Sequence, residues 1–383
     1  MSEVDWHKCK FLESTENLKP LVKKRFGREP SSSIAREIVA CLQQGRLFYE
    51  AAATSPLEIR PLQQFYGMVG FAKALIVATK LNSLATLRPA HGLTDISAGN
   101  SRIAELKLKI ERSGTFQEFN DVIAPLTRLR LIDMVNKSRA MYFPSAKSEA
   151  LQDMELSLQD ILSRIPRLES LYRQTFGEEA LTDTVSLEAG SLEADFRLRV
   201  DDQELFTSRE SLRQMVLRWR ERFPFLRTWR LHSAQHAWGN SLIYFRNVHN
   251  LNIDEFSEEY LNEQDGTFQE QALAGDVNER FSLEDGFGPV GGGYIGGAIS
   301  AIAPVGDLHV SEFSIQYLAL FLLSSLMRYR PQTWTHAISR SVIPGEPADD
   351  RSLSLIERFL DVNQAEIPEV VVQILNPNED PFA

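Results

Sequence analysis

Two residues in one turn-forming stretch are suited to phosphate chemistry. Residues 88–93 read RPAHGL and follow a long apolar segment. A histidine can give or take a proton near neutral pH, and an arginine can hold a phosphate. Arg88 and His91 are therefore the candidate catalytic residues. The same pattern fits a histidine that caps a helix or bonds to the backbone, and the residues alone favour that structural role.

A second group of candidates is a run of arginines interleaved with aromatic residues. Such a pattern can bind phosphates and stack nucleic-acid bases. The alternative is that the aromatics are core and the arginines form a solvated face, partly paired with the acidic residues of 254–285, and this alternative is favoured. The candidate nucleic-acid-binding residues are Arg213, Arg220, Arg222, Arg227 and Arg230.

Metal and cofactor motifs are incomplete. His232 and His236 are spaced as ligands on a helix would be, but the surrounding segment resembles strand and turn, and further ligands are missing. Residues 286–291 match G-x-G-x-x-G, but an acidic segment precedes them and Pro289 interrupts them, so the strand–turn–helix context is absent. We therefore expect no metal and no cofactor, and a structural loop over 286–306.

Composition limits the class of protein. The 383 residues carry a formal net charge of -11, which argues against non-specific coating of nucleic acid but leaves room for a local basic site. The two cysteines, Cys9 and Cys41, and the absence of an apolar leader indicate a cytoplasmic protein. The longest uncharged run, 313–327, is shorter than the roughly 20 residues that span a bilayer, so we expect no membrane contact.

That uncharged run is also the strongest helix signal. Apolar residues occupy nearly every face of a helix over 313–327, which places it in the centre of a core, and Pro331 ends it. An end of this kind, with Arg328, Tyr329, Arg330 and Trp334, suits a helix stop better than a site.

Further helices are predicted at 34–53 and 61–79. Gly67 and Gly70 lie inside the second of these helices, where they indicate a close contact with another helix. We expect the helix at 313–327 to pack against the helix at 61–79.

The rest of the chain gives a mixed pattern. Residues 196–200 alternate apolar and charged side chains, as half-buried strands do. The sequence also predicts helices at 100–113, 151–176 with a break at Pro166, 208–223 and 352–362, strands at 225–231 and 241–248, and a solvated acidic segment at 254–285.

Together these elements predict a mainly α protein of the α+β class, with a small antiparallel β-containing insertion. We expect a helical region at 1–180, a mixed α/β insertion at 181–285 that includes the acidic segment, and C-terminal helices at 286–383 that complete the N-terminal core.

Two separate blocks resemble known families. Residues 44–52, 65–75 and 90–93, which include FYG, FAKAL and AHGL, resemble the HEPN-type helical arrangement. Together with FLLSS at 321–325, Arg328-Tyr329 and PQTW at 331–334, they are similar to the YaaC-like family of bacterial proteins.

The resemblance implies an HEPN-like helical core and a function linked to RNA. HEPN domains are often ribonucleases of toxin and antiviral systems, or RNA-binding relatives, and they commonly pair. Their nuclease signature has a wider spacing between arginine and histidine than Arg88 and His91 have. The expected function is RNA or nucleotide association, with HEPN-type ribonuclease activity in phage defence or stress response. The alternative is a non-catalytic interaction module, with a protein partner of a defence system or a second copy in a homodimer.

Overall fold

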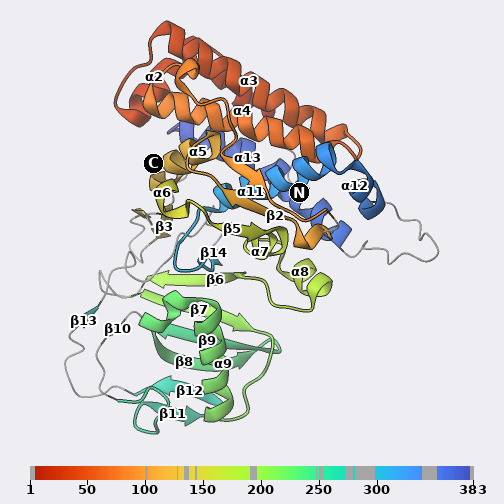
Figure 1. Ribbon diagram of the computed structural model, residues 1–383. Coiled ribbons are helices and arrows are strands. Elements are labelled where there is room, and N and C mark those ends of the chain that lie inside the picture. The colour runs from red at the N-terminus through yellow and green to blue at the C-terminus, as the bar shows by residue number, and fades with distance from the viewer. Residues whose placement is uncertain are drawn as a thin grey trace.

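The chain folds into a helical body and a sheet body, shown at the top and bottom of Figure 1. The structure is a computed structural model, and it describes residues 5–99, 102–126, 128–132, 138–142, 145–189, 196–246, 248–249, 253–271, 279–280, 298–338 and 352–379. Each body has its own apolar core. The α+β class is therefore confirmed.

Four long helices form the centre of the helical body. They are α3 (Ser32–Thr54), α4 (Arg60–Lys80), α11 (Glu312–Tyr329) and α13 (Leu353–Leu375). The Ser31 side chain accepts a hydrogen bond from the Ile34 amide and so caps α3, while Pro61 occupies the first turn of α4. Every α11 residue from Ser314 to Leu326 is buried, which confirms its central position.

Helices α4 and α11 pack directly on each other. The ring of Phe65 on α4 meets the rings of Tyr317 and Phe321 on α11 edge-on, with centroids 5.8 and 6.0 Å apart. The predicted packing of these two helices is therefore confirmed. Residues from both ends of the chain share one core.

The two glycines inside α4 lie against α3. A Cβ atom on Gly70 would be 2.8 Å from the backbone nitrogen of Gly45, and one on Gly67 would be 2.5 Å from the Tyr49 ring. Only residues without side chains allow this approach, so the predicted close helix contact is confirmed.

Along the chain, shorter elements precede these four helices or lie between them. They are α1 (Trp6–Leu12), α2 (Thr15–Phe26), η1 (Leu84–Thr86), β1 (Leu93–Asp95), η2 (Ile103–Glu105), β2 (Lys107–Ile110), α5 (Thr115–Ile123), η3 (Ala124–Leu126), β3 (Arg128–Ile132), β4 (Ser138–Tyr142), α6 (Ser148–Leu151), β5 (Glu155–Ser157), α7 (Leu158–Leu162), α8 (Glu169–Phe176) and α12 (Pro331–Ile338).

The sheet body contains an antiparallel sheet with the strand order β11-β12-β8-β9-β7-β6-β14. The strands are β6 (Thr182–Ala189), β7 (Phe196–Asp202), β8 (Arg230–Ala237), β9 (Asn240–Arg246), β11 (Leu261–Gln264), β12 (Thr267–Glu270) and β14 (Ala298–Ile302). Also in this part of the chain are α9 (Arg209–Arg222), η4 (Pro224–Thr228) and the pair β10 (Val248–His249) and β13 (Glu279–Arg280).

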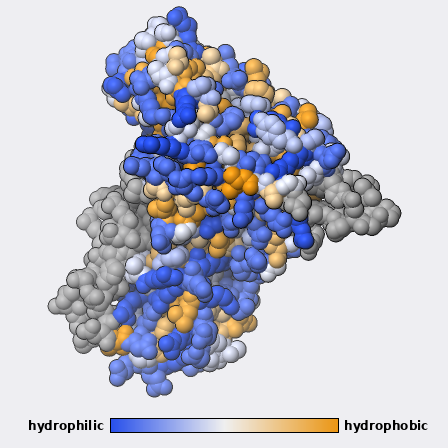
Figure 2. All heavy atoms as spheres, in the orientation of Figure 1, coloured by the Kyte–Doolittle hydropathy of each residue, from blue (hydrophilic) through white to orange (hydrophobic). Residues whose placement is uncertain are grey.

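Helix α9 covers one face of this sheet. Its apolar side packs on the inward residues of β7, of which Leu198 and Val200 are two, and this confirms the alternation seen in the sequence. Figure 2 shows that the visible face of this body is mostly hydrophilic, with scattered hydrophobic residues. The antiparallel character of the β region is confirmed. Strand β14 lies beyond residue 285, and the expected domain boundaries stay a prediction.

A buried arginine ties the two bodies together. The guanidinium of Arg164, just after α7, donates hydrogen bonds to the carbonyl oxygens of Ala303 and Pro304, just after β14. Beside it, the Leu181 amide donates to Ser163 and the Ala303 amide donates to Leu181. The junction therefore includes both backbone hydrogen bonds and the charged side chain of Arg164.

The helix expected at 100–113 is wrong. This segment forms η2 and then β2, which pairs with β1 and β5. Leu106, Leu108 and Ile110 are buried, and Lys107 is exposed. The two-residue period of a strand therefore prevails over the helical spacing that Ile103, Leu106 and Ile110 also satisfy.

The helix expected at 151–176 is also wrong in its extent. The segment contains β5, α7 and α8, and the backbone of Asp153 and Arg167 has positive φ values of 63° and 71°. Residues with positive φ cannot continue a right-handed helix, so they divide the segment.

Three other boundaries differ from the expected ones. Pro224 opens the 3₁₀ turn η4, so the strand expected at 225–231 begins only at Arg230. The acidic segment 254–285 contains the hairpin of β11 and β12 rather than only solvated chain. Helix α13 continues through Pro368 to Leu375, well beyond 362.

Two remaining expectations concern the glycine-rich stretch and the membrane. Strand β14 lies within 286–306, where we expected a loop, while the G-x-G-x-x-G residues 286–291 are outside the described residues.

Among the helices that the structure describes, none combines the length and apolar character needed to cross a bilayer.

Candidate functional site

The turn that carries His91 is held by the start of α5. The Thr115 amide donates to the Ala90 carbonyl at 2.8 Å, and the Phe116 amide donates to the His91 carbonyl at 3.0 Å. The first amides of a helix have no partner within that helix, so this turn satisfies two of them. His91 is thereby fixed between α4 and α5.

Gly92 is required by this arrangement. Its φ is +78°, and a Cβ atom there would lie 1.8 Å from the Oε1 atom of Gln117. The Nε2 atom of Gln117 donates to the Gly92 carbonyl at 2.8 Å and to the Glu111 carbonyl at 2.6 Å. The His-Gly pair in the sequence therefore has a backbone reason, independent of any function for His91.

The His91 ring lies against aromatic residues of two helices. It meets Phe65 of α4 edge-on at a centroid distance of 5.0 Å and Phe321 of α11 at 6.2 Å. The residue is half-buried. Burial lowers the pKa of His91 from its ordinary value, and the positive charges of Arg328 and Lys73 lower this pKa further. The imidazole is therefore neutral near pH 7 and able to accept a proton.

Arg328 is the cation that α11 brings to this histidine. Its Nε atom donates to the Ser324 carbonyl at 3.2 Å. Its guanidinium carbon lies 5.9 Å from the centroid of the Phe65 ring and 4.9 Å from that of Tyr329. Within the described part of the chain, its terminal nitrogens form no ion pair, so they can bind an anion.

Arg88, the other candidate catalytic residue, has a hydrogen-bond partner of its own. It is exposed, and its guanidinium donates to the Ser113 hydroxyl. The charges that lower the pKa of His91 come from Arg328 and Lys73. The catalytic pairing of Arg88 with His91 stays a prediction, whereas the structure brings a different arginine to the His91 ring.

The neighbours of Arg328 at the helix end have structural partners. The Arg330 guanidinium donates to the Ser97 carbonyl at 2.6 Å, and the Trp334 indole donates to the Glu58 carbonyl at 3.0 Å. Sequence reasoning read this whole group as a helix stop, which fits Arg330 and Trp334. It missed Arg328 and Lys73 because their positions beside His91 depend on long-range packing.

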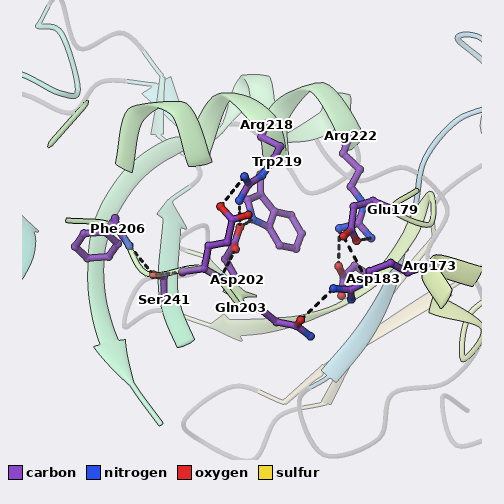
Figure 3. A network of polar contacts seen from close by, with 11 residues as sticks. Arg173, Glu179, Asp183, Asp202, Gln203, Phe206, Arg218, Trp219, Arg222 and Ser241 are labelled. Atoms are coloured by element: carbon purple, nitrogen blue, oxygen red, sulfur yellow. Dashed lines mark hydrogen bonds and ion pairs between the residues drawn. The ribbon is translucent and has the colours of Figure 1, made fainter. Parts of the chain in front are cut away.

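Two of the five candidate nucleic-acid-binding arginines form dense internal contacts. Arg220 pairs with Glu255 and donates to the Trp229 carbonyl at 2.7 Å. Arg222 donates to the carbonyl oxygen of Ala180 at 2.6 Å and to the carboxylate of Asp183 at 2.7 Å. Figure 3 shows Arg222 reaching from α9 to Asp183, beside the separate contact of Trp219 and Arg218 with Asp202.

The other three arginines differ in exposure. Arg230 donates to the Ile253 carbonyl at 2.9 Å. Arg213 is exposed and lies over the Phe256 ring at 5.9 Å, and Arg227 is exposed as well. The five side chains therefore do not share one role, and their binding of nucleic acid stays a prediction.

The two histidines with ligand-like spacing lie on β8, which is a strand. The Nδ1 atom of His232 is 2.7 Å from the Glu270 carboxylate, and the His236 ring packs on Phe206 at 4.3 Å. In the part of the chain that the structure describes, no three His, Cys, Asp or Glu residues are placed to hold a metal ion.

Comparison with known proteins gives one positive finding. A family model described as YaaC-like Protein matches residues 10–375. Neither the curated proteins nor the solved structures give a match.

Proposed function

The chain belongs to the YaaC-like protein family, and from this premise we propose that it binds RNA or a nucleotide through His91, Lys73 and Arg328. The observation that carries the proposal is that the Phe65 ring lies 5.0 Å from the His91 ring and 5.9 Å from the Arg328 guanidinium. The charges of Arg328 and Lys73 also lower the pKa of His91. A phosphate between these groups would be held by the cations while the histidine remains a base.

The proposed reaction is metal-independent cleavage of RNA. His91 takes the proton of a ribose 2′-hydroxyl, and that oxygen attacks the adjacent phosphorus. The bond from phosphorus to the 5′-oxygen breaks, the leaving oxygen takes a proton from water, and a 2′,3′-cyclic phosphate remains. Arg328 and Lys73 stabilise the negative charge that develops on the phosphate. In this proposal Arg328 has the role that the sequence assigned to Arg88.

The HEPN-like relationship and a role in phage defence or stress response are part of the same proposal. Its support is the packing of α3, α4, α11 and α13 into one helical core, with the histidine turn soon after α4. A cytoplasmic location fits a protein that meets RNA or nucleotides.

The test measures RNA binding and cleavage separately. Fluorescence anisotropy with a labelled short single-stranded RNA reports binding, and a denaturing gel reports cleavage. We expect Arg328→Gln to weaken binding about tenfold, which is the effect of one charge-assisted contact. We expect His91→Ala to retain binding and lose cleavage.

Arg88→Gln is the matched control, because it removes an arginine whose side chain bonds to Ser113. It should bind and cleave RNA as the wild-type chain does. Unchanged binding by Arg328→Gln, in a variant with the wild-type melting temperature, would contradict the proposed site.

A second candidate function, a non-catalytic interaction or assembly module, is favoured by Trp238. This residue occupies the turn between β8 and β9, is 90% exposed and has a φ of +53°. A tryptophan in the left-handed region is uncommon, and exposed aromatic side chains are frequent anchors for protein partners. Light scattering would show a homodimer that Trp238→Ser disrupts. A monomeric wild-type chain at every concentration would argue against self-assembly.

A further inference from the structure

We propose that Tyr329 stacks on the base of a nucleotide whose phosphate Arg328 holds, so that the ligand is recognised as a nucleotide and not as phosphate alone. The inference rests on the proposed function of the His91 site. It adds the residue that contacts the second part of the ligand, the base.

The first observation is the exposure of the Tyr329 ring. Tyr329 is 71% exposed, although it is the last residue of a helix that is buried from Ser314 to Leu326. An exposed aromatic ring offers its face to another flat ring, and stacking of this kind tolerates any base. A phosphate without a base would leave that face unused.

The second observation is that Tyr329 is held in a fixed position. Arg330 donates to the carbonyls of Ser97 and Ala98, and Ser325 donates to the Asp95 carboxylate, so the end of α11 is attached to the end of β1 and to the segment that follows it. The indole of Trp334 in α12 is bonded to Glu58. The exposure of Tyr329 is therefore a feature of a rigid helix end.

The third observation is the position of Arg328 between two rings. Its guanidinium carbon is 4.9 Å from the centroid of Tyr329 and 5.9 Å from that of Phe65, and the Phe65 ring contacts His91. One cation is thus adjacent to both the exposed ring and the wall of the histidine site. A nucleotide has the same arrangement, with its base and its phosphate joined through one sugar.

Isothermal titration calorimetry with AMP and with ribose 5-phosphate tests the inference, because the two ligands differ only by the base. We expect the wild-type chain to bind AMP about tenfold more tightly than ribose 5-phosphate, as stacking on one aromatic ring predicts. Tyr329→Ala should remove this difference. Tyr329→Phe, which keeps the ring, should preserve it.

The outcomes separate the inference from the proposed function. Equal binding of AMP and ribose 5-phosphate by the wild-type chain would overturn the role of Tyr329 and leave the phosphate site standing. A preference for AMP that survives in Tyr329→Ala would do the same. Absence of binding by both ligands would reject the inference, while the RNA anisotropy experiment decides the proposed function independently.

Discussion

The environment of His91 separates two influences on its proton affinity. Burial among Phe65 and Phe321 disfavours the charged imidazolium, and the charges of Arg328 and Lys73 disfavour it further. If one of these cations is replaced by a neutral residue, its electrostatic effect on the pKa of His91 is lost, but the effect of burial on this pKa remains. The two can therefore be distinguished by substituting one cation at a time.

We predict that Arg328→Gln raises the pKa of His91 part of the way back to its ordinary value. The loss of a positive charge makes protonation easier, and the remaining burial and Lys73 keep the pKa lowered. NMR titration of the imidazole signals measures this, with the His91 signal assigned from the spectrum of His91→Gln. Arg88→Gln is the control and should leave the His91 titration unchanged. A larger shift in Arg88→Gln than in Arg328→Gln would restore the pairing expected from the sequence.

Single substitutions can also distinguish structural arginines of the sheet body from exposed ones. Arg222 is surrounded by protein acceptors and lies 4.9 Å from the Phe223 ring, while Arg227 is exposed. We predict that Arg222→Gln lowers the free energy of unfolding by about 2 kcal/mol, because it leaves Asp183 without its charged partner. Arg227→Gln should leave stability unchanged. Urea denaturation followed by circular dichroism measures both, and equal stability of the two variants would contradict a structural role for Arg222.

Helices and strands were predicted correctly where the sequence contains one strong pattern of apolar residues or glycines. Helix α11 is buried from Ser314 to Leu326, and its sequence is uncharged from Phe313 to Met327. The contact of α4 with α3 was predicted from Gly67 and Gly70, because glycine in a helix interior destabilises the helix unless a neighbour needs the space. These are cases in which local sequence and tertiary packing favour the same structure.

Residues 103–110 were predicted wrongly because their apolar residues fit both a helix and a strand. Ile103, Leu106 and Ile110 fit one face of a helix, but Leu106, Leu108 and Ile110 also fit one face of a strand. The choice depends on β1 and β5, which pair on either side of β2. A segment of this kind is decided by partners that are distant in the sequence, so propensity alone cannot assign it.

The contact between α3 and α4 gives a prediction at this scale. Gly70→Ala should lower the free energy of unfolding by about 1–3 kcal/mol, because its Cβ would meet the backbone of Gly45, which cannot move aside as a flexible side chain can. This loss outweighs the gain in helix propensity of about 1 kcal/mol. Gly99→Ala, where a Cβ would meet no atom within 4 Å, is the control. Thermal unfolding that is equal for both variants would refute the close approach.

At the scale of the whole molecule, the candidate site and the core depend on the same long-range assembly. His91 comes from the N-terminal half of the chain and Arg328 from the C-terminal part, and they meet because α4 packs on α11. Arg88 was the natural candidate from sequence because it is close to His91 along the chain. The sequence predicted that α4 and α11 pack together. The spacing of residues could not show that Arg328, at the end of α11, lies near His91.

A buried polar network joins α11 to α3 and α13. The Tyr49 hydroxyl of α3 donates to Asn363 of α13 at 2.7 Å, and Asn363 donates to Gln316 of α11 at 2.9 Å. Gln316 in turn donates to the carboxylates of Glu312 and Glu366 at 3.1 and 2.9 Å. Arg167 is paired with Glu366. The network thus ends at the neighbouring carboxyl groups of Glu312 and Glu366, the second of which pairs with Arg167.

The fully buried member of that pair makes the stability of the whole molecule depend on pH. Burial raises the pKa of Glu312 well above its ordinary value, and the charge of Glu366 and a hydrogen bond to it raise this pKa further. The folded chain therefore holds a proton that the unfolded chain releases. This raised pKa contributes stability that is fully present below the pKa of the carboxyl group in the unfolded chain, near 4.5. The contribution is lost as the pH rises through the pKa of Glu312 in the folded chain.

We predict that Glu312→Gln removes this loss, because a glutamine amide can donate to Glu366 at every pH as the protonated carboxyl does. Between the two pKa values of Glu312, the wild-type free energy of unfolding should fall by up to about 1.4 kcal/mol per pH unit from this group alone. The variant should lack that slope and be the more stable chain at alkaline pH. Urea denaturation at a series of pH values measures the difference. Glu369→Gln, on the exposed side of α13, is the matched control and should keep the wild-type slope. If the pH profiles of the wild-type chain and Glu312→Gln run parallel, Glu312 is ionised in the folded chain and the prediction is wrong.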